Sequence, residues 1–301
     1  MRYLLTGILT GSLVLMNTLV CMVPLMAFAL LKLCIPLRGF RAFCFETVRS
    51  IAAVWISLNI LIFRYLTPTD WDIRGQQTLK RNESLLVISN HQTWVDIPAL
   101  MVAIHGKAPF FTFFLKRELI WVPLLGLAWW ALEYPFMRRH SKAQLEKNPQ
   151  LRGQDLEITR KACEQLNGRS VSLVNYLEGT RFTPAKHQQQ QSPYKHLLKP
   201  KSGGVAFTLN AMHDQLDHYL DVTLVYPGKQ PPTFWELLSG KIGKVVIDIQ
   251  KQPIPSAMMQ GDYQQDPAFR AAFQAWINQL WQAKDERIEG LRKELLANPK
   301  A

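Results

Sequence analysis

A histidine and an aspartate five residues apart could form a general-base pair in the stretch Asn90–Asp96. His91 follows the apolar run Leu85–Ile88, which predicts a buried strand, and Asp96 precedes the apolar run Ile97–Val102, which predicts a helix. A histidine at the end of a strand can take a proton near neutral pH, and a nearby carboxylate can orient its ring. Because such spacings also occur by accident on protein surfaces, the pair alone is weak evidence of catalysis.

A second stretch whose residues could take part in chemistry follows the predicted strand Val171–Leu177. Gly179 allows the backbone to turn sharply and a ligand to approach closely. Thr180 offers a hydroxyl, and Arg181 offers a rigid fork of donors that suits a phosphate group. The alternative interpretation is an ordinary turn with an arginine on the surface.

A basic doublet, Arg138-Arg139, follows the predicted strand Leu132–Met137. Such a doublet is often no more than a pair of solvated charges. However, His91, Arg139 and the run Glu178–Arg181 all come directly after predicted strands. In a parallel sheet these positions lie at one edge, so we expect the three groups to converge on one crevice.

The overall charge points to anionic partners. The 301 residues include 35 Lys+Arg and 23 Asp+Glu, which gives a net charge of +12 and favours nucleic acid, anionic lipid or phosphorylated substrates. The first third of the chain is much more apolar than the rest, which favours lipid. The four cysteines lack CxxC spacing, and the histidines lack an HExxH pattern, so we expect neither a disulfide framework nor a metal site.

The N-terminal segment is predicted to associate with a membrane. From Tyr3 to Leu37 the only charged residue is Lys32, and the stretch exceeds the roughly 20 apolar residues that cross a bilayer. A cleaved signal peptide ending near Ala27–Ala29 is the alternative. The apolar stretch is much longer than a signal peptide requires and continues past these small residues, which favours an uncleaved anchor.

A second apolar stretch, Ile51–Ile62, could be a tilted span, a re-entrant element or an interfacial helix. Arg38 and Arg41 between the two stretches favour a cytoplasmic location for this connection, although Arg2 has the opposite effect. We therefore predict a membrane anchor of one or two helices over residues 1–66 and a second domain over residues 67–301.

From residue 67 onward, apolar runs alternate with helical patterns, which predicts an α/β fold with a mostly parallel sheet flanked by helices. The predicted strands are Leu85–Ser89, Phe110–Leu115, Leu132–Met137, Val171–Leu177, Val222–Tyr226 and Val245–Ile249. The predicted helices are Ile97–His105, Glu118–Ala131, Asp155–Asn167 and Ser202–Met212. A last helix is predicted to begin after an Asp266 N-cap and to pack an apolar stripe on the sheet, with an interfacial membrane helix as the alternative.

The order and separation of His91-x4-Asp96 and Glu178-Gly179-Thr180-Arg181 resemble the paired signatures of the glycerolipid acyltransferase family. This family includes the 1-acyl-glycerol-3-phosphate acyltransferases, and the resemblance covers about residues 80–230. It implies that His91 is the general base and Asp96 its partner. It also implies that Arg139 and the loop Glu178–Arg181 bind the acceptor, and that Val225-Tyr226-Pro227 lies near the acyl donor.

The resemblance implies transfer of a fatty acyl group from acyl-CoA or acyl carrier protein to 1-acyl-glycerol-3-phosphate, giving phosphatidic acid, with no cofactor beyond the donor. Leu177, where many members have proline, and the run Phe182-Thr183 resemble the lysophospholipid branch more closely. An acceptor such as lysophosphatidylglycerol or lysocardiolipin is therefore the alternative. We expect a membrane location, the bacterial inner membrane with the catalytic domain in the cytoplasm, and no nucleic-acid partner. A basic membrane-tethered protein that binds anionic lipid or RNA is the non-enzymatic alternative.

Overall fold

The computed structural model describes residues 1–297 except 138–156, 158–159, 165, 167 and 229. The chain forms two compact units, each built from segments that are separate in the sequence. Unit 1 comprises Met1–Thr69, Phe113–Arg139 and Trp235–Ile242, and unit 2 comprises Asp70–Thr112, His140–Phe234 and Gly243–Ala301. The long apolar N-terminal segment therefore belongs to unit 1, and both sequence signatures belong to unit 2.

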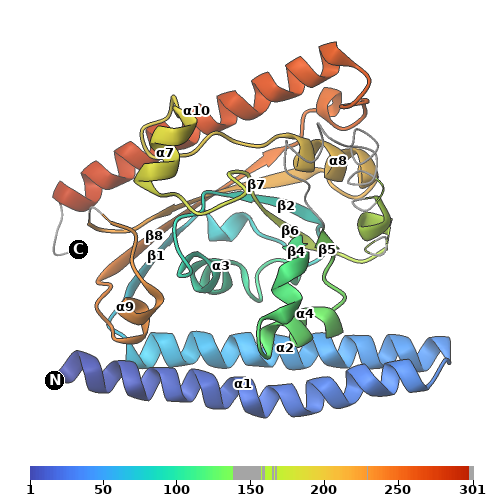
Figure 1. Cartoon of the computed structure of the whole chain (residues 1–301), viewed down its shortest axis with the longest axis vertical. Coiled ribbons are helices and arrows are strands. Elements are labelled where there is room, and N and C mark those ends of the chain that lie inside the picture. Colours follow the sequence, from blue (N-terminus) through green and yellow to red (C-terminus); the bar gives the residue numbers. More distant parts are fainter. Residues whose placement is uncertain (138–156, 158–159, 165, 167, 229, 298–301) are drawn as a thin grey trace. The chain divides into compact units, whose positions relative to one another are not determined.

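Unit 1 is built on a hairpin of two long helices, α1 (Arg2–Cys34) and α2 (Arg38–Leu66), which lie side by side in Figure 1. Pro36 lies in the connection, where proline commonly follows a helix end. Both helices are long and apolar enough to cross a membrane, by length and composition alone. Most large apolar side chains of α1 are exposed. The second apolar stretch seen in the sequence is thus the middle of a longer helix.

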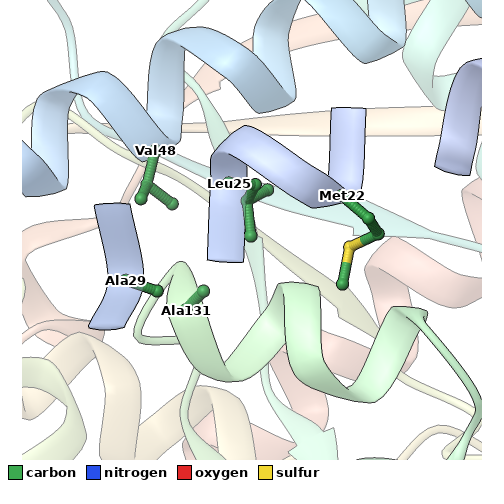
Figure 2. Close-up of a cluster of buried hydrophobic side chains, with 5 residues drawn as sticks. All are labelled: Met22, Leu25, Ala29, Val48 and Ala131. Carbon is green, nitrogen blue, oxygen red and sulfur yellow. The ribbon is translucent and has the colours of Figure 1, made fainter. Parts of the chain in front are cut away.

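Apolar packing joins the hairpin to a short helix, α4 (Leu125–Ala131). Figure 2 shows Met22, Leu25 and Ala29 of α1 facing Ala131 of α4, with Val48 of α2 beside them. All five side chains are buried. Ala29, near the end of the alternative cleavage site, is thus part of this cluster, and the uncleaved anchor stays a prediction.

The segment between residues 110 and 137 is more broken than its apolar pattern predicts. The predicted helix Glu118–Ala131 is a 3-10 turn, η2 (Arg117–Trp121), followed by α4, because Pro123 between them interrupts a helix. The predicted strand Phe110–Leu115 divides into β3 (Phe111–Phe113) and β4 (Leu115–Lys116). Only its end, β5 (Phe136–Met137), remains of the predicted strand Leu132–Met137. The strands β4 and β5 form a separate two-stranded parallel sheet.

Unit 2 contains a six-stranded sheet with the order β1-β8-β7-β2-β6-β3. At its centre β2 (Leu85–Ser89) is parallel to both β6 (Ser172–Tyr176) and β7 (His218–Val225), and all five β2 side chains are buried. The strand β8 (Lys244–Pro253) runs antiparallel to β7 and parallel to β1 (Asp70–Arg74). The prediction of a mostly parallel sheet flanked by helices is confirmed. The sequence pattern missed β1 because this edge strand is short and charged.

Helices cover both faces of this sheet: α10 (Pro267–Ala297) crosses one face and α3 (Asp96–Ile104) lies on the other (Figure 1). Two shorter helices, α7 (Pro184–Gln190) and α8 (Gly203–Ala211), follow β6, and α9 (Phe234–Leu238) follows β7. The structure describes only residues 157, 160–164 and 166 of the predicted helix Asp155–Asn167. Its other positions lie outside the described residues.

The last helix begins as its sequence predicts. The Asp266 carboxylate accepts hydrogen bonds from the backbone N–H groups of Ala268 and Phe269, at 2.8 and 3.1 Å, which is the geometry of an N-cap. In its apolar stripe Phe273, Ile277 and Leu280 are buried. Trp281 also lies in the interior, with its indole N–H donating to the Leu198 carbonyl at 2.9 Å. The structure therefore supports packing of this helix on the sheet over an interfacial membrane helix.

Candidate active site

The paired His91 and Asp96 side chains are in direct contact. His91 lies in the loop after β2, and Asp96 is the first residue of α3. The Nδ1 atom of His91 lies 2.7 Å from Oδ2 of Asp96. The His91 side chain is 18% exposed, whereas that of Asp96 is fully buried. Five residues of separation in the sequence thus become a hydrogen-bonded pair, as the proposed base and its orienting carboxylate require.

Four donors hold the Asp96 carboxylate. Besides His91, its Oδ2 accepts from the backbone N–H groups of Gln92 and Thr93, at 2.6 and 3.0 Å. Its Oδ1 accepts from the Tyr226 hydroxyl at 2.7 Å. Hydrogen bonds to a carboxylate favour its ionised form. The carboxylate can accept a hydrogen bond from the His91 Nδ1–H, which leaves the other ring nitrogen, Nε2, with a lone pair for proton transfer.

An aromatic ring supports the histidine from the side. The ring of Tyr176, the last residue of β6, stacks on the His91 imidazole with 4.1 Å between centroids and an 18° angle between planes. Across the described residues, no hydrogen-bond partner is recorded for His91 Nε2. The imidazole is therefore held by Asp96 and Tyr176 while its second nitrogen remains available to a substrate.

The second signature reaches the histidine through its backbone. The Glu178 carboxylate is fully buried and accepts from the backbone N–H of His91 at 2.8 Å and from that of Leu198 at 3.0 Å. In addition, the backbone N–H of Phe182 donates to the His91 carbonyl at 2.7 Å. Burial raises the pKa of the Glu178 carboxyl to about 8, against the effect of the two N–H donors. This geometry supports a positioning role for Glu178.

The remaining residues of the second signature form a cationic turn. Gly179 has a φ of 66°, which glycine adopts readily and other residues rarely do. The Arg181 guanidinium stacks over the Trp94 ring at 4.8 Å. Lys186 donates from Nζ to the Thr180 hydroxyl at 2.7 Å and to the Arg181 carbonyl at 3.1 Å. The turn thus places two cations beside a hydroxyl, a combination suited to a phosphate.

Side-chain amides fix the loop that carries His91. The Asn90 amide donates to the Leu224 carbonyl and its oxygen accepts from the Leu224 N–H, both at 2.9 Å, so the end of β2 is tied to the end of β7. Gln92 donates to the same carbonyl at 3.2 Å. The position of Asn90 directly after a buried strand was the available sequence signal for this role. Nothing in the local sequence identified Trp94, Tyr176 or Lys186 as members of the site.

The structure brings His91, Asp96 and Glu178–Arg181 together at the ends of the adjacent parallel strands β2 and β6, as expected. Arg139 lies outside the described residues, so its convergence on this site stays a prediction. The strand before it, β5, belongs to the small sheet with β4 and not to the sheet that carries His91. Tyr226, which the resemblance places near the acyl donor, lies against Asp96.

Cys163 and possible groups of metal ligands are the other features that could carry chemistry. Cys163 is buried, and burial raises the pKa of its thiol to about 12, which suits packing and not attack as a thiolate. Within the described ranges, no cluster of three or more His, Cys, Asp or Glu side chains could hold a metal ion. The chemistry that the arrangement can perform is removal of a proton by His91 next to a cationic turn.

Comparison with known proteins gives consistent matches. The family model described as Acyltransferase matches residues 70–226. The 1-acyl-sn-glycerol-3-phosphate acyltransferase gamma of Mus musculus is 26% identical over 213 residues, 67% of this chain and 52% of that protein. The delta protein of Mus musculus is 28% identical over 216 residues with the same coverage. The chain thus spans about half the length of the curated relatives it matches.

A solved structure shares the fold over nearly the whole chain. It is the crystal structure of the 1-acyl-sn-glycerophosphate (LPA) acyltransferase PlsC from Thermotoga maritima, with a TM-score of 0.53. The alignment covers 97% of this chain and 98% of that chain at 16% sequence identity, so the likeness is one of fold.

Proposed function

Because the chain belongs to the acyltransferase family, we propose that it transfers a fatty acyl group from an acyl thioester to the free hydroxyl of 1-acyl-glycerol-3-phosphate. The product would be phosphatidic acid, a precursor of phospholipids. The observation that carries the proposal is the 2.7 Å contact between His91 Nδ1 and the buried Asp96 carboxylate, next to the turn that carries Arg181. The names of the matched relatives support this choice of acceptor.

In the proposed mechanism the acceptor hydroxyl is the nucleophile. His91 Nε2 takes the hydroxyl proton while the oxygen forms a bond to the thioester carbonyl carbon. Asp96 stabilises the imidazolium that results, as the aspartate does in a serine-protease triad. The carbon–sulfur bond then breaks, and the leaving thiolate receives the proton from His91. No serine or cysteine nucleophile is needed, because the substrate supplies the attacking oxygen.

The cationic turn is the proposed acceptor site. Arg181 can form charge-assisted hydrogen bonds to the phosphate, Gly179 allows close approach of the backbone, and Thr180 adds a hydroxyl donor. We retain Arg139 as a proposed phosphate ligand on the family resemblance alone. For Glu178 the buried carboxylate supports a positioning role, in which it holds the backbone of His91 next to the acceptor. We propose acyl-CoA or acyl carrier protein as the donor.

We further propose that α1 and α2 attach the enzyme to the membrane that contains its substrates, with residues 1–66 as anchor and 67–301 as the catalytic domain. The exposed apolar side chains of α1 support this role. At about 1.5 Å per residue, α1 would be about 50 Å long, which exceeds a hydrocarbon core of about 30 Å. Arg38 and Arg41 favour a cytoplasmic location for the helix connection. In a bacterium the membrane would be the inner membrane.

A panel of acceptors tests this proposal. The full chain is purified in detergent, returned to phospholipid vesicles, and supplied with one acyl-CoA and either 1-acyl-glycerol-3-phosphate, lysophosphatidylglycerol or lysocardiolipin. We expect the fastest transfer to 1-acyl-glycerol-3-phosphate. Preference for an acceptor with a headgroup would instead support the lysophospholipid alternative that Leu177 and Phe182-Thr183 favour. Salt-sensitive binding to vesicles without transfer to any acceptor would support the non-enzymatic alternative.

The same assay with His91→Ala tests the mechanism. Loss of the general base should lower the transfer rate at least 10²–10⁴-fold, while the protein remains folded. His213→Ala is the matched control, because His213 is partly exposed in the turn after α8 and hydrogen-bonds to the Asn210 carbonyl. Turnover close to normal in His91→Ala would exclude His91 as the base.

A further inference from the structure

Tyr226 occupies a buried position directly behind the catalytic carboxylate. It follows β7, its side chain is only 2% exposed, and its hydroxyl donates to Asp96 Oδ1 at 2.7 Å. The neighbouring residue Leu224 is tied to Asn90 by two hydrogen bonds of 2.9 Å. The backbone on both sides of the contact is therefore fixed, which favours a specific hydrogen bond over an incidental one.

The two oxygens of Asp96 have different surroundings. Oδ2 accepts from His91 Nδ1 and from the backbone N–H groups of Gln92 and Thr93. For Oδ1, the described part of the chain records only one donor, the hydroxyl of Tyr226. A fully buried carboxylate oxygen needs a donor, because burial without one is costly. Tyr226 therefore completes the set of donors around the Asp96 carboxylate.

We propose that Tyr226 is a positioning residue that sets the basicity of His91 through its hydrogen bond to Asp96. The inference rests on the proposed function for its effect on turnover, but its effect on the imidazole does not depend on turnover. The phenol shares the negative charge of the carboxylate, so less of that charge is available to stabilise an imidazolium. Loss of this hydrogen bond should therefore make the imidazole more basic.

Other ionisable groups around the pair come from several elements. Tyr176 of β6 stacks on the imidazole, and Glu178 lies under the His91 backbone. Lys284 of α10 interacts electrostatically with Glu178, and Arg181 is held over Trp94. Tyr176 also interacts electrostatically with Tyr226. The ring stacking of Tyr176 on His91, the bond from His91 N–H to Glu178 and the stacking of Arg181 on Trp94 do not involve the Tyr226 hydroxyl. Burial raises the pKa of Tyr226 well above its usual value, so the phenol remains a donor.

Removal of the Tyr226 hydroxyl should shift the pH profile in a defined direction. In Tyr226→Phe, Oδ1 loses its donor and the pair as a whole binds a proton more tightly. The direction is the same whether the proton is assigned to His91 or shared with Asp96. We expect the acidic limb of the pH profile of kcat/KM to move up by about 0.5 to 1 unit. The plateau should fall about tenfold, which corresponds to one hydrogen bond to a charged group, while the acceptor KM stays unchanged.

A stronger hydrogen-bond donor can also be placed at position 226. Replacing Tyr226 with 3-fluorotyrosine makes the phenol a stronger acid and a stronger donor with little change in size. We expect the acidic limb to move down in this variant. The matched control is Tyr219→Phe in β7, because Tyr219 is also buried but its ring packs edge-on against Trp276 and not on the catalytic pair. It should leave the profile unchanged.

The experiment combines pH profiles of the full-length variants with NMR titration of the His91 imidazole in histidine-labelled protein, assigned with His91→Gln. Opposite shifts in the two Tyr226 variants support the proposal. Equal profiles for wild type and Tyr226→Phe, or shifts of the same sign in both variants, overturn it. If Tyr226→Phe does not fold, the 3-fluorotyrosine variant alone tests the proposal. An NMR titration of His91 that is unchanged in this variant overturns it. If no acceptor is acylated, the proposed function fails, while the NMR titration still tests Tyr226.

Discussion

The backbone N–H of His91 donates to the Glu178 carboxylate at 2.8 Å, which joins the two sequence signatures across 87 residues. The other oxygen of Glu178 accepts from Leu198 N–H, and Phe182 N–H donates to the His91 carbonyl. The peptide groups on both sides of His91 are thus fixed by the loop after β6. The glutamate of the second signature thus holds the backbone of the histidine of the first, which is the contact expected if His91 is the proposed base.

We predict that Glu178→Gln lowers kcat about tenfold with little change in the acceptor KM. The amide has one oxygen to replace two acceptors, so one buried N–H, of His91 or of Leu198, loses its partner. Kinetics at saturating donor measure the effect, and Glu286→Gln, at an exposed position of α10, is the control. A raised acceptor KM with unchanged kcat would instead place Glu178 in contact with the acceptor.

The same substitution should change the pH dependence of stability. The pKa of Glu178 rises from 4.5 in a free carboxyl to about 8 in the folded protein. Between these values the folded protein holds a proton that the unfolded chain releases, so this group lowers stability as pH rises from about 4.5 to about 8. We expect the thermal midpoint of wild type to fall relative to that of Glu178→Gln across this window. A difference that stays constant with pH would contradict the raised pKa.

Much of this site could be predicted from the sequence because its parts follow apolar runs. The runs before His91 and Glu178 are buried strands, and adjacent parallel strands bring their ends together. The role of Tyr226 could not be predicted, because β7 joins β2 through long-range pairing that local periodicity does not encode. The structure of residues 110–137 was also not predicted correctly, for a related reason. Leu124, Ala128 and Ala131 pack in one apolar cluster with a helix hairpin that is distant in sequence, whereas Phe111–Phe113, at the start of the segment, join the main sheet.

We predict that Trp94→Ala raises the KM for a phosphate-bearing acceptor two- to fivefold and leaves kcat nearly unchanged. Trp94 is half exposed and carries the Arg181 guanidinium on its face, a contact worth about 0.5–1 kcal/mol at an exposed site. Without the ring, Arg181 must be ordered when the phosphate binds. Acceptor and donor KM values are measured separately in Trp94→Ala, Trp94→Phe and Arg181→Ala.

The combination of Trp94→Ala with Arg181→Ala is the decisive variant of this set. If the tryptophan acts through the arginine, the double variant binds the acceptor no worse than Arg181→Ala alone. Arg160→Ala, at an exposed arginine that forms ion pairs with Glu157 and Glu164, should leave both KM values unchanged. Equal increases in donor and acceptor KM would remove Arg181 from the acceptor site.

We predict that Lys284→Met destabilises the protein by about 3–5 kcal/mol, because it leaves a buried carboxylate without its cation. Lys284 of α10 is fully buried, forms an ion pair with Asp221 of β7, and donates to the Val222 carbonyl at 2.7 Å. The double variant Lys284→Met with Asp221→Leu should recover most of the loss, since an apolar pair can replace a buried ion pair. Thermal midpoints measure both, and Lys293→Met, at an exposed position of α10, is the control. No recovery in the double variant would mean that the contact to Val222 dominates.

The helix hairpin of unit 1 provides the last prediction, because polar side chains join α1 and α2 inside otherwise apolar surroundings. Asn17 donates to the Asn59 side chain and to the Trp55 carbonyl, both at 3.0 Å, and the Trp55 indole donates to Thr18 at 3.0 Å. Between membrane helices, hydrogen bonds of this kind contribute about 0.6–2 kcal/mol each. We predict that Asn17→Leu lowers the thermal midpoint in lipid vesicles, even though leucine is the more apolar residue.

A double-mutant cycle separates the hydrogen bond between Asn17 and Asn59 from the effect that each substitution has on its own helix. Asn17→Leu and Asn59→Leu remove the same hydrogen bond, so their combined effect should be smaller than the sum of the single effects. Thr47→Val is the control, because the Thr47 hydroxyl bonds within α2 to the Phe43 carbonyl and does not reach α1. Strictly additive effects would show that Asn17 and Asn59 stabilise their own helices independently. A subadditive result would show that the hydrogen bond between Asn17 and Asn59 couples α1 to α2.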